Sequence, residues 1–269
     1  MSGGFTNRYV CKSLVPYDFI SAKQRLENHY SSVQGESHEL RSIVSLEPEI
    51  IISEEERYLS GKLYFQTESK MIDYEITQDK KLINTNNVRR NTFTVDFSLS
   101  SNGETILFRN SGKSVIEGSK ILSNILSQNP DNIKNLNFDI RKIEADVLSK
   151  KLLGMWTFSF RERHGNIKSG TSYGEDVDQD PMYGQVGSAP KNWIGIKTDI
   201  DDRIIKIAIF RKGTIRLLTN LEGEGNLPRI FEIIEELKEY QFVDEENVAV
   251  QSARDQSDNV DFDESYSTA

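Results

Sequence analysis

Cysteine is nearly absent from this chain of 269 residues, in which Cys11 is the single example. One thiol excludes disulfides within the chain and is typical of a reducing compartment. With three histidines as the only other soft ligands, the composition also argues against a structural zinc site. Long apolar runs are missing as well, since no stretch approaches the roughly 18 residues of a membrane-spanning helix. The sequence therefore predicts a protein that has no metal centre and does not enter a membrane.

Arrangements that carry catalysis are also missing. No Ser/His/Asp, Cys/His or paired-carboxylate pattern argues for an active site. The run from Asn110 to Ser114 is similar to a phosphate-binding loop, but Leu107 stands where that motif needs its first glycine. A helix start with Ser111 near the N-cap explains the run better. The acidic run 199–202 is explained by turn formation rather than by a metal. We expect neither enzymatic activity nor a cofactor.

The formal net charge of −9 is concentrated at one end of the chain. Residues 244–269 hold eight acidic residues and one arginine, so this tail carries −7 and the rest of the chain only −2. The tail has no lasting apolar period, and we expect it to be disordered. It is either a solvated spacer, or a segment that binds a protein or mimics DNA and inhibits its own chain. The net charge therefore does not exclude a nucleic-acid partner.

One stretch, residues 190–240, has the clearest pattern. It predicts strands at Trp193–Thr198, Ile204–Phe210 and Thr214–Thr219, followed by a helix at Pro228–Tyr240. Gly213 allows the tight turn between the last two strands. Isoleucines alternate along the second strand and mark its core face. The other face carries Lys206 and Phe210, with Trp193 nearby, which is unusual both for a core and for a solvated surface.

An upstream stretch repeats this plan in degenerate form. A strand at Thr92–Phe97, a turn at Asn102–Gly103, a strand at Glu104–Arg109 and a helix at Ser111–Gln128 follow in the same order. The segment GETILFRN, residues 103–110, aligns without a gap with GTIRLLTN, residues 213–220. Two copies of strand, turn, strand and helix predict a pseudo-symmetric molecule.

The spacing of the C-terminal copy resembles TATA-box-binding proteins. That family has a Pro-x-x-Phe strand start, a hairpin and a Phe-x-x-Gly strand end in each of two repeats. Here Pro190, Trp193, Arg203, Phe210 and Gly213 fit that pattern over about fifty residues. The likeness is strongest to the divergent TATA-binding-like proteins of large eukaryotic DNA viruses. It implies an α+β fold: a saddle of two repeats of curved antiparallel sheet, with helices on the convex face. The molecule would be a monomer with an internal pseudo-twofold.

The resemblance also implies a function. It predicts a transcription initiation factor that bends promoter DNA through the minor groove and recruits a factor-IIB-like protein and RNA polymerase, in the nucleus or in a viral factory of the host cytoplasm. The implied wedges are Trp193, Phe210, Phe97 and, as the partner of Phe97, Phe65. The implied contacts to phosphates and the groove are Lys142, Lys197, Arg203, Lys206, Arg211, Lys212 and Arg216.

Three substitutions depart from the family pattern. Lys142 replaces a groove-contacting asparagine, and Lys206 and Arg216 replace small or apolar residues, which puts a preference for TATA sequences in doubt. The alternative function is a protein-interaction module that uses the same fold without binding DNA. We expect an N-terminal repeat at 1–130, a C-terminal repeat at 131–242 and the acidic tail at 243–269. Within these, 84–90 is expected to form a polar loop and 165–189 a mobile surface loop.

Overall fold

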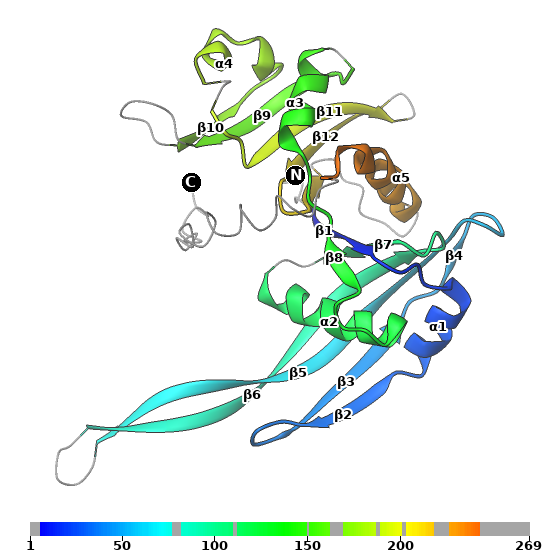
Figure 1. Ribbon diagram of the computed structural model, residues 1–269, viewed down its shortest axis with the longest axis vertical. Coiled ribbons are helices and arrows are strands. Elements are labelled where there is room, and N and C mark those ends of the chain that lie inside the picture. The colour runs from blue at the N-terminus through cyan, green and yellow to red at the C-terminus, as the bar shows by residue number, and fades with distance from the viewer. Residues whose placement is uncertain are drawn as a thin grey trace, which may run out of the picture.

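Figure 1 shows a computed structural model of the chain. It describes residues 6–76, 82–109, 112–149, 151–161, 169–186, 189–200, 203–217 and 226–242. A single antiparallel sheet of 13 strands runs through this part of the chain, and helices pack against it. This architecture agrees with the expected α+β class. Among the described residues, no helix has both the length and the apolar character needed to cross a membrane.

The sheet contains strands from both ends of the chain. Its elements are β1 (Thr6–Ser13), β2 (Tyr30–Gln34), β3 (Glu39–Leu46), β4 (Ile50–Ile51), β5 (Arg57–Ile76), β6 (Leu82–Ser100), β7 (Thr105–Phe108), β8 (Ile133–Asn135), β9 (Gly154–Arg161), β10 (Ser169–Tyr173), β11 (Trp193–Ile200), β12 (Arg203–Phe210) and β13 (Thr214–Leu217). The main path runs β10-β9-β11-β12-β13-β1-β7-β6-β5-β3-β2, with β4 paired to β5 and β8 paired to β1. Strands β5 and β6 form a long hairpin that projects from the body (Figure 1).

Two of the described helices begin at an aspartate that caps them. The helices are α1 (Phe19–Glu27), α2 (Lys113–Ser127), α3 (Ile140–Leu148), α4 (Pro181–Val186) and α5 (Leu227–Leu237), with short 3-10 turns at Val177–Gln179 and Lys238–Tyr240. The side chain of Asp18 accepts from the backbone N–H of Ser21 at the start of α1, and Asp139 accepts from that of Arg141 at the start of α3. In α2 the N-cap is Gly112, the residue after Ser111, in agreement with a helix start that has Ser111 near the N-cap.

Strand β1 joins the two halves of the sheet. It pairs with β13 from Thr6 to Tyr9 and with β7 from Tyr9 to Lys12. On either side the order is the same, because β7-β6-β5-β3 on one side is matched by β13-β12-β11-β9 on the other. The two hairpins that flank β1 turn at Gly103 and Gly213, which have φ of 73° and 81°. The degenerate repeat of the sequence is therefore present in the strand order.

Two hydrophobic cores lie on opposite faces of the sheet. In the first core, Phe97 and Phe108 pack with side chains of α1 and α2. In the second core, Ile207 and Ile215 pack with side chains of α3, α4 and α5. Strand β1 contributes to both cores through neighbouring residues that point to opposite faces. The expectation that the helices of both repeats pack on one face of the sheet is therefore wrong.

Several local expectations also differ from the structure. Residues 84–90 belong to β6 rather than to a loop, because every residue from Leu82 to Ser100 has a partner on β5. The segment 165–189, expected to be a mobile loop, contains β10, the turn Val177–Gln179 and α4. Phe97 lies opposite Gly61, and Phe65 instead faces Phe93, with ring centres 5.6 Å apart. The residues of the expected tail, 243–269, lie outside the described residues.

The burial of Phe97 gives a first prediction. Phe97 is 2% exposed in the first core, so Phe97→Ala should lower the free energy of unfolding by about 3–5 kcal/mol. Phe93→Ala is the matched control, because Phe93 lies on the same face but is 37% exposed. Denaturant unfolding of both variants measures the difference, and equal losses would contradict the packing described here.

Candidate nucleic-acid interface

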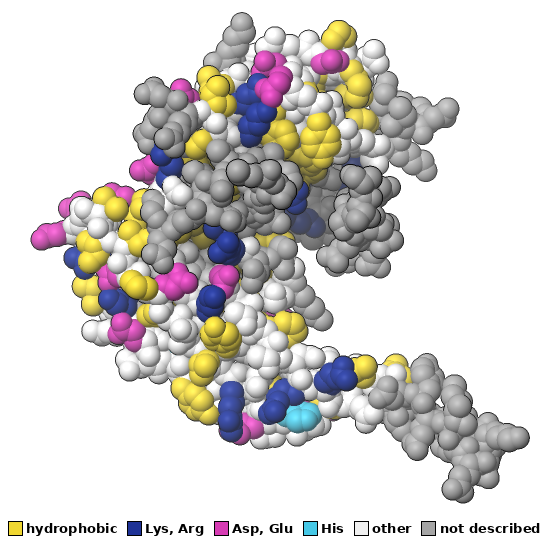
Figure 2. Space-filling view, turned by 180° about the vertical axis from the view of Figure 1, so that it is seen from behind, with side chains coloured by type: hydrophobic (Ala, Val, Ile, Leu, Met, Phe, Trp, Pro, Cys, Tyr) yellow, Lys and Arg dark blue, Asp and Glu magenta, His cyan; other side chains and the backbone are white. Residues whose placement is uncertain are grey.

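The second half of the sheet has a face that none of the described helices covers. Helices α3, α4 and α5 all contribute to the second core, on the other face. Direct cross-strand pairing places Trp193 opposite Phe210 and Lys197 opposite Lys206. Directly opposed residues project from the same side of a sheet, so these four side chains share the uncovered face. We call it the open face. Figure 2, seen from behind, shows hydrophobic side chains and a group of basic and acidic side chains in its upper part.

Four aromatic rings cross the open face as a continuous row. The rings of Trp193 and Phe210 are stacked, with centres 5.4 Å apart and an interplanar angle of 26°. Tyr173, on the edge strand β10, lies 6.3 Å from Trp193 and 6.3 Å from Trp156. Tyr173 is 68% exposed, Trp193 and Phe210 are half-buried, and Trp156 is buried. We call Trp156, Tyr173, Trp193 and Phe210 the aromatic row.

A cation and a glycine complete the row. Arg216 pairs with Ala208 across β12 and β13, and its guanidinium carbon lies 5.6 Å from the centre of the Phe210 ring. A Cβ atom at Gly195 would lie 2.6 Å from the Trp156 ring, so only glycine leaves room for this indole against the sheet. The indole N–H of Trp156 is buried and has no hydrogen-bond partner among the described residues. Such a group is rare in folded proteins.

Beyond Gly195, the open face carries a pair of lysines bridged by carboxylates. Lys197 Nζ lies 2.6 Å from Glu175 Oε2 and 2.8 Å from Asp176 Oδ1, and Lys206 Nζ contacts Glu175 Oε1. Hydrogen bonds from Lys197 and Lys206 lower the pKa of Glu175 to about 2. Hydrogen bonds to Asp176 and Glu175 raise the pKa of Lys197. Glu175 and Lys197 are therefore both charged at neutral pH.

The structure brings together part of the predicted site. Trp193, Phe210 and Arg216 are in contact, and Arg211 and Lys212 lie at the turn that follows Phe210. The side chain of Arg203 lies outside what the structure describes.

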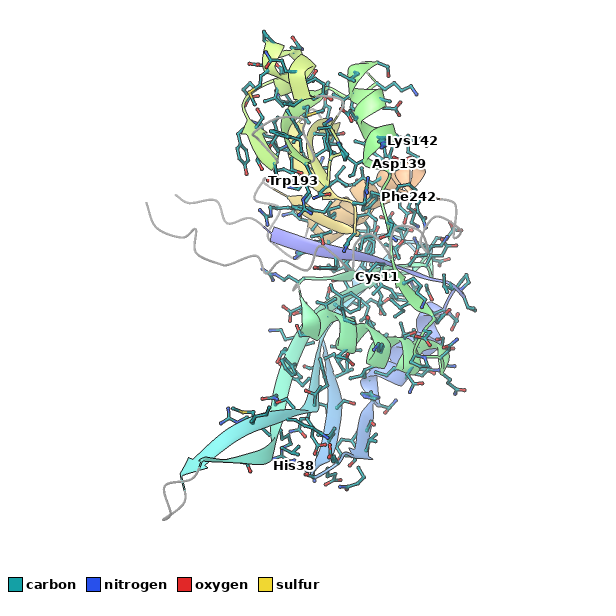
Figure 3. The ribbon with its side chains drawn as sticks, turned by 60° about the vertical axis from the view of Figure 1, so that its left-hand side comes forward. Cys11, His38, Asp139, Lys142, Trp193 and Phe242 are labelled. Carbon is teal, nitrogen blue, oxygen red and sulfur yellow. The ribbon has the colours of Figure 1, made fainter. Side chains whose placement is uncertain are left out.

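Three predicted site residues are corrected. Phe65 and Phe97 cannot act as wedges, because they are 1% and 2% exposed in the first core. Lys142 lies on α3, where its Nζ bonds the carbonyl of Glu239 and sits over the ring of Tyr240. Figure 3 shows Lys142 and Trp193 on opposite sides of the second half. The resemblance placed these three residues by alignment, which does not reveal the face that a helix covers.

Sequence reasoning missed three residues of the open face. Trp156 receives no role from the sequence patterns, and Tyr173 and Glu175 fall in the segment expected to be a mobile surface loop. The register between β9 and β11 shifts at Gly195 and Ile196, which is why Trp156 turns toward the open face. The available signal was Gly195 itself, since glycine inside a strand often marks a bulge or a close approach.

A cleft of about 310 Å³ lies on the opposite face of the sheet, in the first half. It is walled by β1, β5, β6 and the first turn of α5. Arg8, Lys62 and Arg109 line it together with Asp96 and Glu47. The mixture of charges and the separate face set this cleft apart from the aromatic row.

Comparison with known proteins does not assign the chain to a family. No protein-family model matches the sequence, and no curated protein does. A function for the open face must therefore be inferred from the residues on that face.

The bridge between Glu175 and the lysines predicts an acid dependence of stability. The folded pKa of about 2 lies below the ordinary value of 4.5, so the contribution of this carboxylate is complete above about pH 4.5 and is lost as the pH falls toward 2. Lys197, whose pKa is raised, stays charged in this window, and Asp176 also contacts it. Glu175→Gln should flatten the stability curve in this window, measured by denaturant unfolding at several pH values. Glu117→Gln on α2 is the control, and equal slopes for the two variants would refute the assignment.

Proposed function

We propose that the chain is a nucleic-acid-binding protein that uses the open face, with the aromatic row as a stacking surface. The observation that carries the proposal is the contact of four rings and Arg216 on a sheet face that none of the described helices covers. Aromatic side chains on an open sheet stack on bases, and arginine adds both charge and a planar surface.

The geometry favours a single strand over a duplex. Bases of a single strand already expose their faces, whereas a duplex must be unstacked before a ring can reach them. Bending by wedges on both sides of a site needs two exposed aromatic pairs, and Phe65 and Phe97 lie in the first core. One exposed pair therefore suits an unpaired strand better than a symmetric kink.

The TATA-binding-like function implied by the family resemblance is a weaker proposal. A saddle that bends promoter DNA and recruits a factor-IIB-like protein and RNA polymerase needs both repeats to present the same face. Here the first core and the second core occupy opposite faces. The Lys206 and Arg216 substitutions are also easier to explain as contacts to a strand than as a groove floor.

A protein partner is the second candidate function, and a separate observation favours it. On the face of the first half opposite α1 and α2, Tyr30 lies opposite Ile43, and Ile43 lies opposite Tyr64. Tyr30 and Ile43 are 62% and 45% exposed. Exposed aromatic and aliphatic side chains in one patch are typical of protein interfaces.

Substitutions in the row test the proposed function. Phe210→Leu keeps an apolar side chain but removes the ring face, so binding of a single strand of about 12 nucleotides should weaken about 5- to 150-fold, the loss of one stacked base. Arg216→Ala should weaken binding and make the dependence of log K on log salt shallower by about 0.7. Fluorescence anisotropy across a salt series measures both effects.

Lys142→Ala is the matched control, because it removes a cation from the far side of the same half. It should leave both affinity and salt slope unchanged. Thermal unfolding verifies that the Phe210 variant is folded. Absence of binding by the parent chain, or equal losses in all three variants, would overturn the proposal. A duplex that binds more tightly than the single strand and bends on binding would instead favour the saddle.

A further inference from the structure

The two lysines of the open face stand directly opposite each other on neighbouring strands. Lys197 and Lys206 are a register pair of β11 and β12. Like charges in this position repel and destabilise a sheet unless an anion lies between them. Here one carboxylate bridges the pair, since the two oxygens of Glu175 contact one lysine each, and Asp176 Oδ1 contacts Lys197 as well. The pair is therefore arranged around one bidentate oxyanion.

We propose that Lys197 and Lys206 form a phosphate-binding site for a strand held on the aromatic row, and that Glu175 occupies this site when no strand is bound. The inference rests on the proposed function. A phosphodiester presents two anionic oxygens on one centre, as a carboxylate does, and lysine binds phosphate as a point charge. Glu175 thus acts as a stand-in for the phosphate within the same chain.

The position of the lysines along the strands fits one continuous ligand. Trp193 and Lys197 are four residues apart on β11, which corresponds to about 13 Å along an extended strand. Gly195 and Ala208 form a register pair between these two positions, and the Trp156 ring lies against Gly195. A strand stacked on Trp193 can therefore pass over the Trp156 ring and place a later phosphate between the lysines.

Glu175 belongs to a segment that touches both parts of the site. Tyr173, two residues earlier, is a member of the aromatic row. Gly174 donates its backbone N–H to the carbonyl of Trp156, and Asp178 accepts from the backbone N–H of Met155. Glu175 itself is exposed and held only by its lysines among the described contacts. Its side chain can swing away without breaking the backbone contacts on either side.

Glu175→Gln tests this exchange. The amide keeps the shape of the side chain but no longer competes as an anion, so a single strand of about 12 nucleotides should bind at least about fivefold more tightly at about 50 mM salt. Each lysine released for phosphate should steepen the slope of log K against log salt by about 0.7, so the gain shrinks about 2.6-fold per lysine between about 50 and about 200 mM. Adding Lys197→Ala and Lys206→Ala to Glu175→Gln should abolish the gain.

Glu117→Gln on α2 is the matched control, because it changes the net charge equally at a distance from the open face. Tighter binding by both glutamine variants would reduce the effect to net charge and overturn the inference. Unchanged affinity and slope in Glu175→Gln, with the parent chain binding normally, would assign Glu175 a structural role only. Absence of binding by the parent and by Glu175→Gln alike would instead refute the proposed function.

Discussion

The fold depends on the pairing of β1 with both halves of the sheet. Without this strand, β7 and β13 would be the edges of two separate sheets. Its side chains also contribute to both cores: Val10 packs in the second core, and Cys11, the next residue, packs in the first. Alternation along one short strand therefore decides which face each set of helices covers. It follows that the open face of the second half is uncovered because of a pairing made some 200 residues away in sequence.

Besides β1, helix α5 also connects the two halves. Its Phe231 packs against Tyr58 of β5, with ring centres 5.0 Å apart. Its Glu235 accepts hydrogen bonds from Asn102 and Thr105 at the first hairpin, at 2.9 and 3.0 Å. These contacts draw one end of the first half into the second core. They also place the first turn of the helix along the wall of the cleft.

Local patterns made much of the second half predictable. The hairpin at Gly213, the alternation along β12 and the amphipathic helix at 227–237 follow from short-range rules, and they correctly placed Trp193 beside Phe210. Pairing between strands that are distant in the chain has no comparable signal in the sequence. The strand at 84–90 is polar and looks like a loop until its partner on β5 is known. Alternation likewise puts Phe97 on a face but cannot say that α2 covers that face. Glu175 was missed because its role comes from two lysines on other strands.

The symmetry of the sheet limits what one ligand can contact. Strands β7 and β13 both run antiparallel to β1, so they run parallel to each other. Two copies with that relation are exchanged by a twofold rotation along β1, which lies in the sheet and interchanges its faces. A saddle instead needs an axis perpendicular to the sheet, which makes the equivalent strands antiparallel and keeps the helices of both copies on one side. In this molecule, the face of the first half opposite α1 and α2 is therefore the reverse of the one that carries the aromatic row. A nucleic acid on that row engages one repeat, and the exposed Tyr30 and Ile43 remain available to a different partner.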